Sequence, residues 1–137
     1  MPRTLHRLVY RSDSNISHDD EPALRETFQT SLVNNRRARI TGALALPDGK
    51  FVQVLEGSRA AVSALMERLT SDVRHSGIAV LGEWPITARL FSGWAMAHPD
   101  PEPLDLQAFR IMTSVGSGAQ VVGLLRALVD DRSSPMF

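Results

Sequence analysis

Short apolar runs separated by polar turns mark out the first half of the chain. Residues 5–10 form an apolar run that ends in Val9 and Tyr10, and a polar stretch follows at residues 11–15. This pattern predicts a strand and then a loop. Residues 40–46 and 51–55 flank an Asp-Gly turn, which predicts a β-hairpin.

Two amphipathic stretches predict helices. Asp19 or Asp20 before Glu21 and Pro22 predicts the start of a helix. Apolar residues spaced four apart predict that this helix extends to about Asn35. Ser58 is the predicted N-cap of a second helix, whose apolar positions fall at i, i+3, i+4 and i+7. These positions are Val62, Leu65, Met66 and Leu69.

The remaining segments complete a mixed fold. Residues 78–84 predict a fourth strand that Pro85 interrupts, and residues 93–98 predict a fifth. The order βαββαβ, plus one strand, predicts an α+β ferredoxin-like sheet with two helices on one face. A proline-rich linker follows, and two short appended helices are predicted at 104–111 and 117–130. We expect a domain at 1–98 and an extension at 99–137.

Composition and charge argue against several classes of partner: nucleic acids, membranes and metal ions. Fifteen basic residues balance fifteen acidic ones, so nucleic acid is not an expected partner. There is no cysteine and no apolar run long enough for a membrane span or a signal peptide, so we expect a cytoplasmic protein without a membrane partner. The four histidines are too scattered to predict a metal site.

Polar and aromatic side chains interrupt the apolar faces of the predicted strands and first helix. Strand alternation places Tyr10, Gln53 and Trp94 among apolar neighbours. Helical spacing puts Phe28, Ser31, Leu32 and Asn35 on one face. Each could be satisfied locally, but an unpaired buried Gln costs about 1–3 kcal/mol. A planar polar ligand would satisfy all of them together.

Five motifs, in this order, resemble the BLUF family of blue-light photoreceptors over about residues 5–98. They are Leu8-Val9-Tyr10-Arg11-Ser12, Asn34-Asn35 with Ile40-Thr41-Gly42, Phe51-Val52-Gln53-Val54-Leu55-Glu56-Gly57, Asp72-Val73-Arg74-His75 and Phe91-Ser92-Gly93-Trp94-Ala95-Met96. The resemblance implies a ferredoxin-like fold that binds FAD, with FMN or riboflavin sometimes accepted, between its two helices.

By motif, the resemblance also assigns roles to residues. Tyr10 is the electron donor, Gln53 is the switching amide, and Trp94 and Met96 are a pair whose side chains exchange near Gln53. Flavin contacts fall by motif to Tyr10, Asn34, Asn35, Gln53 and Met96, with Arg74 and His75 at the phosphate end. Phe28 and Ser31, which share a helical face with Asn35, are added as further flavin contacts. Such a protein is not an enzyme, and we expect it to signal through a homo-oligomer or a separate effector protein by way of residues 104–130.

Two other functions fit the same fold. An acylphosphatase-like hydrolase needs a glycine-rich phosphate loop after the first strand, and residues 11–19 contain no glycine. A flavin-free interaction domain would not need Tyr10, Asn35 and Gln53 together. A yellow colour in the purified protein distinguishes the photoreceptor from both.

Overall fold

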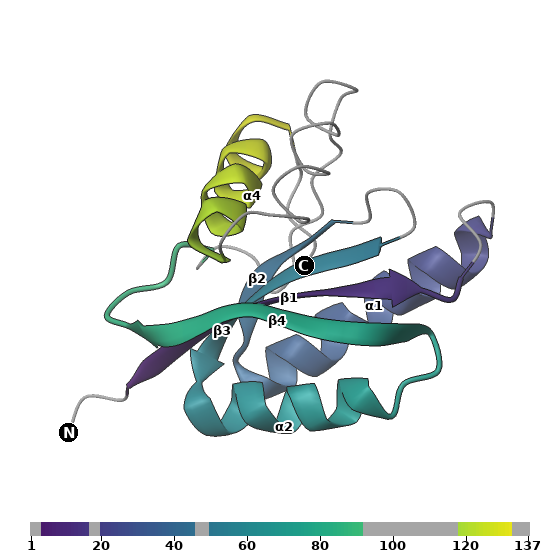
Figure 1. Cartoon of the computed structure of the whole chain (residues 1–137), viewed down its shortest axis with the longest axis horizontal. Coiled ribbons are helices and arrows are strands. Elements are labelled where there is room, and N and C mark those ends of the chain that lie inside the picture. The colour runs from purple at the N-terminus through teal and green to yellow at the C-terminus, as the bar shows by residue number, and fades with distance from the viewer. Residues whose placement is uncertain (1–3, 17–19, 46–49, 92–117, 133–137) are drawn as a thin grey trace.

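A four-stranded antiparallel sheet forms the centre of the fold, with its strands in the order β2-β3-β1-β4 (Figure 1). The computed structural model describes residues 4–16, 20–45, 50–91 and 118–132. The strands are β1 (Leu5–Ser14), β2 (Thr41–Ala45), β3 (Lys50–Ser58) and β4 (His75–Ile86). This strand order, with a helix after β1 and another after β3, is the predicted ferredoxin-like arrangement.

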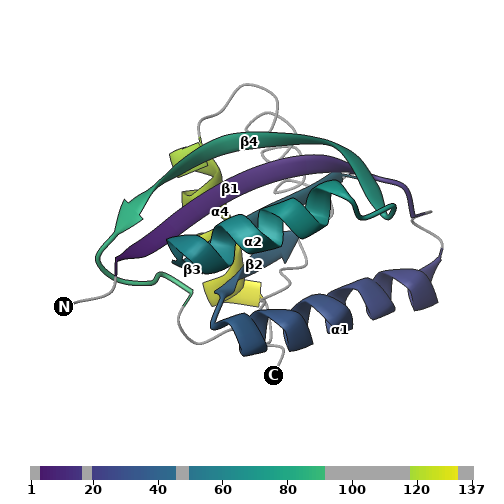
Figure 2. The same ribbon diagram turned by 90° about the horizontal axis from the view of Figure 1, so that it is seen from below.

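Helices α1 (Glu21–Ala38) and α2 (Arg59–Thr70) lie on the same face of the sheet (Figure 2). Both begin at the predicted caps, because the side chain of Asp20 accepts from the Ala23 N–H and that of Ser58 from the Ala61 N–H. Helix α1 runs three residues beyond the predicted end at Asn35 and stops where Arg39 adopts a left-handed conformation, with φ 57°. Arginine and alanine favour a helix, so nothing before Arg39 ends it.

Helix α4 (Gly118–Arg132) covers the opposite face of the sheet, so the second appended helix folds back as expected (Figure 1). Strand alternation divides the core into two clusters. Leu8, Tyr10, Phe51 and Leu55 face α1 and α2, whereas an α4-side cluster faces α4. The α4-side cluster is Val9, Ala43, Val52, Val54, Phe91, Val121, Val122 and Leu125. Because both faces are covered, β3 is buried from Phe51 to Gly57.

Strand β4 differs from the sequence prediction. It spans His75–Ile86 and continues through Pro85, so the prediction that this proline interrupts the strand is wrong. The reason is that β4 is at the edge of the sheet formed by the described strands, where a missing N–H can face away from the sheet without cost. Its pairing with β1 shifts register between Val9 and Tyr10, which leaves Leu81 as an extra residue in β4.

Several predictions concern residues outside the described ranges. They are the fifth strand at 93–98, the helix at 104–111 and the division between residues 98 and 99. Within the described ranges, none of the helices combines the length and apolar character that crossing a bilayer requires.

Candidate functional site

A pocket opens between α1, α2 and the sheet, and most of the predicted site residues meet there. Together with open solvent at its mouth, it encloses about 820 Å³ of empty space. Its lining is Tyr10, Thr27, Thr30, Ser31, Asn34, Asn35, Leu44, Phe51, Gln53, Leu65, Arg68, Leu69, Asp72, Arg74 and His75.

Helix α1 supplies a polar stripe to one side of the pocket. Thr27, Thr30, Ser31, Asn34 and Asn35 follow i, i+3, i+4, i+7 and i+8 spacing, so they share one helical face. Asn35 is the most enclosed, with 1% of its surface exposed. The sequence prediction named the last three but missed the two threonines. The same spacing, read for polar residues, would have found them.

Tyr10 and Gln53 form the inner wall. They stand directly opposite each other in the β1–β3 pair, and the Tyr10 hydroxyl donates a hydrogen bond to Gln53 Oε1. Both are buried, at 2% and 4% exposure. Burial, and to a smaller extent the charge of Asp72, raises the pKa of Tyr10 above its ordinary value. The phenol is therefore neutral at physiological pH and available as a hydrogen-bond donor.

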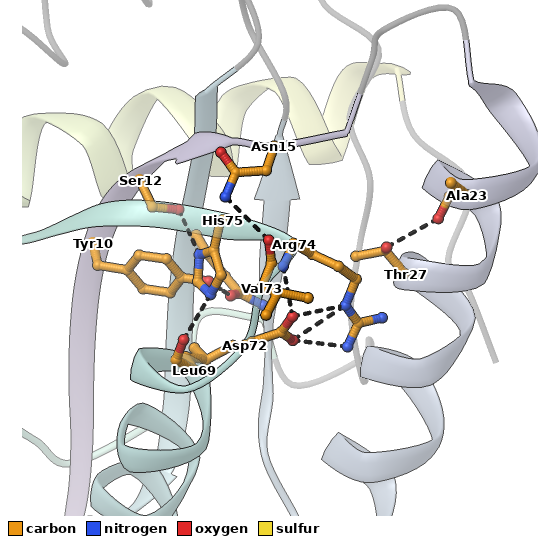
Figure 3. Close-up of polar contacts among 11 residues, drawn as sticks. Tyr10, Ser12, Asn15, Ala23, Thr27, Leu69, Asp72, Val73, Arg74 and His75 are labelled. Atoms are coloured by element: carbon orange, nitrogen blue, oxygen red, sulfur yellow. Dashed lines mark hydrogen bonds and ion pairs between the residues drawn. The ribbon is translucent and has the colours of Figure 1, made fainter.

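His75 closes the pocket beside Tyr10 (Figure 3). Its Nε2 is 3.0 Å from the carbonyl oxygen of Leu69, which can only accept, so Nε2 carries a proton. In the neutral ring Nδ1 then accepts from the Ser12 hydroxyl, 2.7 Å away. The ring also meets Phe51 edge-on, at 5.8 Å between centroids. His75 thus links β1, α2 and β4, and both of its ring nitrogens are engaged by the protein.

Asp72 and Arg74 form an ion pair at the pocket mouth. The Arg74 guanidinium donates from Nη2 to Asp72 Oδ2 at 2.8 Å and from Nε to both carboxylate oxygens, at 3.0 and 3.2 Å. The hydrogen bond from Arg74 lowers the pKa of Asp72. Arg74 extends in the direction of α1 (Figure 3), and about 36% of its side chain is exposed. This ion pair and Arg68 are the charged groups among the residues that line the pocket.

The chemistry of the lining fits a flat heteroaromatic ligand with one polar edge. Leu44, Phe51, Leu65 and Leu69 give apolar surface, while the amides of Asn34, Asn35 and Gln53 each offer both a donor and an acceptor. An isoalloxazine ring has an apolar end and an edge of alternating carbonyl and N–H groups. Neutral amides can match that edge without burying a charge.

The structure brings seven of the predicted site residues to this pocket: Tyr10, Ser31, Asn34, Asn35, Gln53, Arg74 and His75. Phe28 belongs to α1, but its side chain is not described. Trp94 and Met96 lie outside the described residues. Besides the two threonines, the sequence prediction missed Asp72, Arg68 and the α2 leucines as pocket residues. Of the described residues, no three His, Asp or Glu side chains gather as a metal site would require.

Comparisons with known proteins agree on one family. The family model described as "BLUF: Sensors of blue-light using FAD" matches residues 5–97. "Photoactivated adenylate cyclase subunit beta" of Euglena gracilis is 28% identical over 123 residues, which cover 82% of this chain but 14% of that protein. The chain therefore spans a small part of the curated relatives it matches.

Three solved structures with similar folds are proteins whose names refer to BLUF or to light. "BlrB - a BLUF protein, dark state structure" is 31% identical with a TM-score of 0.78, covering 94% of this chain and 97% of that one. "BlsA photo-activated state" is 25% identical with a TM-score of 0.82, covering 96% and 99%. A light-regulated adenylyl cyclase of bacteria is 28% identical with a TM-score of 0.67, covering 91% of this chain and 40% of that one.

Proposed function

The chain belongs to the BLUF family, the sensors of blue light that use FAD, and from this membership we propose that it signals by exchanging hydrogen bonds around Tyr10 and Gln53. The observation that carries the proposal is the hydrogen bond between these two buried side chains on the inner wall of the pocket. A switch of this kind consumes no substrate. The light response consists of a change in which group donates and which group accepts each hydrogen bond.

Residues on both sides of the pocket hold the cofactor in this proposal. Asn34, Asn35 and Ser31 face it from α1, and Gln53 faces it from β3. Because the side-chain amides offer donors and acceptors together, they match the alternating polar edge of the ring. Leu44 and Leu65, which also line the pocket, would contact its apolar surface.

When bound, a flavin supplies a chromophore for blue light that, once excited, can take an electron from a neighbouring phenol such as that of Tyr10. The protein's own contribution is the Gln53 amide, whose carbonyl accepts from Tyr10 in the structure. A half-turn or tautomerisation of that amide replaces an acceptor by a donor on the side facing Tyr10. A glutamate in the same place could not do so, since an ionised carboxylate only accepts.

Trp94 and Met96 keep their proposed role as the pair that responds to Gln53. The support is their sequence motif, which begins at Phe91, the last described residue before that segment. Comparison of Trp94→Phe and Met96→Leu with the natural chain, by the rate of dark recovery, tests each residue separately.

Arg74 remains the proposed contact for the phosphate end of FAD, since its partly exposed guanidinium lies at the pocket mouth. His75 has a different role in our proposal. Because both of its ring nitrogens already bind Ser12 and Leu69, it positions the wall beside Tyr10 and does not reach a phosphate.

We further propose that the output passes by contact to a second copy of the chain or to a separate effector protein, through the region that contains α4. Helix α4 supports this because it packs on the sheet face opposite the pocket, against Val9 and Val54, which neighbour Tyr10 and Gln53 in sequence.

A cysteine-free composition supports a cytoplasmic location.

The decisive experiment is an absorption spectrum of the purified protein before and after blue light. We expect a flavin spectrum that shifts to the red and returns in darkness. Tyr10→Phe and Gln53→Leu should bind flavin but lose the shift. Gln29→Leu is the matched control, because Gln29 is exposed on α1 and does not line the pocket.

Either of two results contradicts the proposal. A protein that takes up no flavin would be an interaction domain on the same fold. A normal light-induced shift in Gln53→Leu would exclude the side-chain amide of that residue as the switch.

A further inference from the structure

Residues 89–91, just after β4, are held to the rest of the molecule by three different anchors. The guanidinium of Arg89 donates to Thr41 Oγ1 at 2.8 Å, to the Glu56 carbonyl at 2.9 Å and to the Arg39 carbonyl at 2.8 Å. The backbone N–H groups of Leu90 and Phe91 donate to the Glu56 carboxylate. The Phe91 side chain is fully buried in the α4-side cluster.

Glu56 is an unusual residue to find at the centre of this arrangement. Its side chain has 0% of its surface exposed, and buried carboxylates are rare unless they are paired. Three donors satisfy it: Arg7 Nε at 2.8 Å, the Leu90 N–H at 3.1 Å and the Phe91 N–H at 2.9 Å. The Arg7 side chain is itself only 10% exposed. The carboxylate is therefore charged and neutralised within the protein.

The position of Glu56 relates it to the photoactive pair. It lies three residues after Gln53 on β3, so its side chain points to the opposite face of the sheet. Its ion-pair partner Arg7 lies three residues before Tyr10 on β1, and the two charged residues stand opposite each other as Tyr10 and Gln53 do. The same pair of strands thus carries the pocket wall on one face and this anchor on the other.

Resting on the proposed function, we propose that Glu56 is a positioning residue of the light response. Its carboxylate, held by Arg7, fixes the backbone at Leu90 and Phe91, from which the chain enters the segment that contains Trp94 and Met96. In this proposal, a change at Gln53 reaches that segment through β3, because residues 89–91, from which the chain enters the segment, are held to β3. The three donors to Glu56 and the three acceptors of Arg89 provide that fixed point.

The test uses the full chain loaded with FAD and three variants. Glu56→Gln removes the charge and presents an N–H group towards donors that need an acceptor. Arg89→Lys keeps the positive charge but replaces the planar five-donor group that serves three acceptors. Asp13→Asn is the matched control, because it breaks the exposed ion pair of Asp13 with Lys50 at the other end of the same two strands.

For each variant the dark-recovery rate after a blue-light pulse is measured together with hydrogen exchange at the Leu90 and Phe91 amides and the free energy of unfolding. We expect Glu56→Gln and Arg89→Lys to retain flavin, to exchange faster at these two amides and to change the recovery rate about 2- to 30-fold, the usual range for residues that carry coupling. Asp13→Asn should match the natural chain in recovery and exchange. A purely structural role would lower the stability and leave the recovery rate unchanged.

The possible failures can be told apart. If the natural chain shows no reversible shift, the proposed function fails, and this inference fails with it. If the natural chain does shift but both variants recover at its rate, only the inference is overturned. It is also overturned if Asp13→Asn changes the rate as much as Glu56→Gln does, because the effect would then not depend on the anchor. Arg89 is only partly buried, so Arg89→Lys keeps the inference testable if Glu56→Gln does not fold.

Discussion

The Tyr10 hydroxyl donates to the side-chain carbonyl of Gln53, and the two residues face each other across the central strand pair of the sheet. Their spacing is therefore set by the backbone ladder between β1 and β3, which is buried on both faces. A rotation of the Gln53 amide can change this contact without moving either strand. In the proposed switch, the moving part is therefore one side chain, and the strands keep their pairing.

Tyr10 should resist ionisation at alkaline pH. It is the only tyrosine in the sequence, so tyrosinate absorbance reports this residue alone. Burial and the Asp72 charge raise its pKa in the folded protein, whereas the unfolded chain has the ordinary value of about 10. We expect no tyrosinate signal as the pH passes 10 while the protein stays folded. Asp72→Asn should lower the midpoint only modestly, because burial is the larger cause.

The same shift predicts a stability difference at high pH. Because the pKa of Tyr10 is higher in the folded state, the folded protein holds the phenol proton more tightly than the unfolded chain does. The contribution of this proton to the free energy of unfolding is complete below pH 10 and is lost as the pH rises towards the folded pKa. Relative to Tyr10→Phe, the free energy of unfolding should fall by up to about 1.4 kcal/mol per pH unit above pH 10. Parallel curves for the two proteins in urea titrations would contradict the burial of the phenol.

Ser12 and His75 should be energetically coupled. Replacing His75 with Phe keeps a ring against Phe51 but leaves the buried Ser12 hydroxyl without its partner, at a cost of about 1–3 kcal/mol. Ser12→Ala removes the hydroxyl itself. In the double variant no Ser12 hydroxyl is left without a partner, and the loss of the His75 hydrogen bond to the Leu69 carbonyl is common to both His75 variants. The loss of stability in the double variant should therefore be at least 0.5 kcal/mol, which is about a third of a unit of log K, smaller than the sum of the single losses.

Urea unfolding of the four proteins completes this cycle. Additive losses would show that the 2.7 Å contact contributes nothing to the folded state. Flavin content measured on the same samples tests the proposed positioning role of His75. If Ser12→Ala retains flavin and His75→Phe does not, the imidazole contributes to binding beyond its hydrogen bond to Ser12.

The sequence predicted the elements whose signals are local. Caps such as Asp20 and Ser58, and the alternation that places Tyr10 and Gln53 on one face, depend on neighbouring residues and were correct. Pro85 was misjudged because a proline is tolerated only at a sheet edge, and the strand order that makes β4 an edge is a property of the whole fold.

The site was predicted in part for the same reason. The family motifs identified six pocket residues and helical spacing added Ser31, and the structure shows that all seven line one cavity. The engagement of both His75 nitrogens depends on Ser12 and on the Leu69 carbonyl, which come from two other elements. Glu56 belongs to a quoted motif, yet its partners lie 49 residues before it in Arg7 and 34 and 35 residues after it in Leu90 and Phe91. No local pattern reveals contacts at such separations.

Two glycines of α4 should respond to alanine in opposite directions. A Cβ on Gly118 would lie 3.1 Å from the Leu81 carbonyl oxygen and 3.2 Å from the Gly82 Cα, beside the extra residue of β4 opposite Val9 and Tyr10. A Cβ on Gly123 would meet no atom within 4 Å. Gly123→Ala should therefore stabilise the protein by about 0.5–1 kcal/mol, because alanine favours a helix interior. Gly118→Ala should destabilise it by about 1–3 kcal/mol through overpacking against the β4 backbone. Thermal or urea unfolding of the two variants checks both signs, and stabilisation by Gly118→Ala would contradict the close packing of α4 on the sheet.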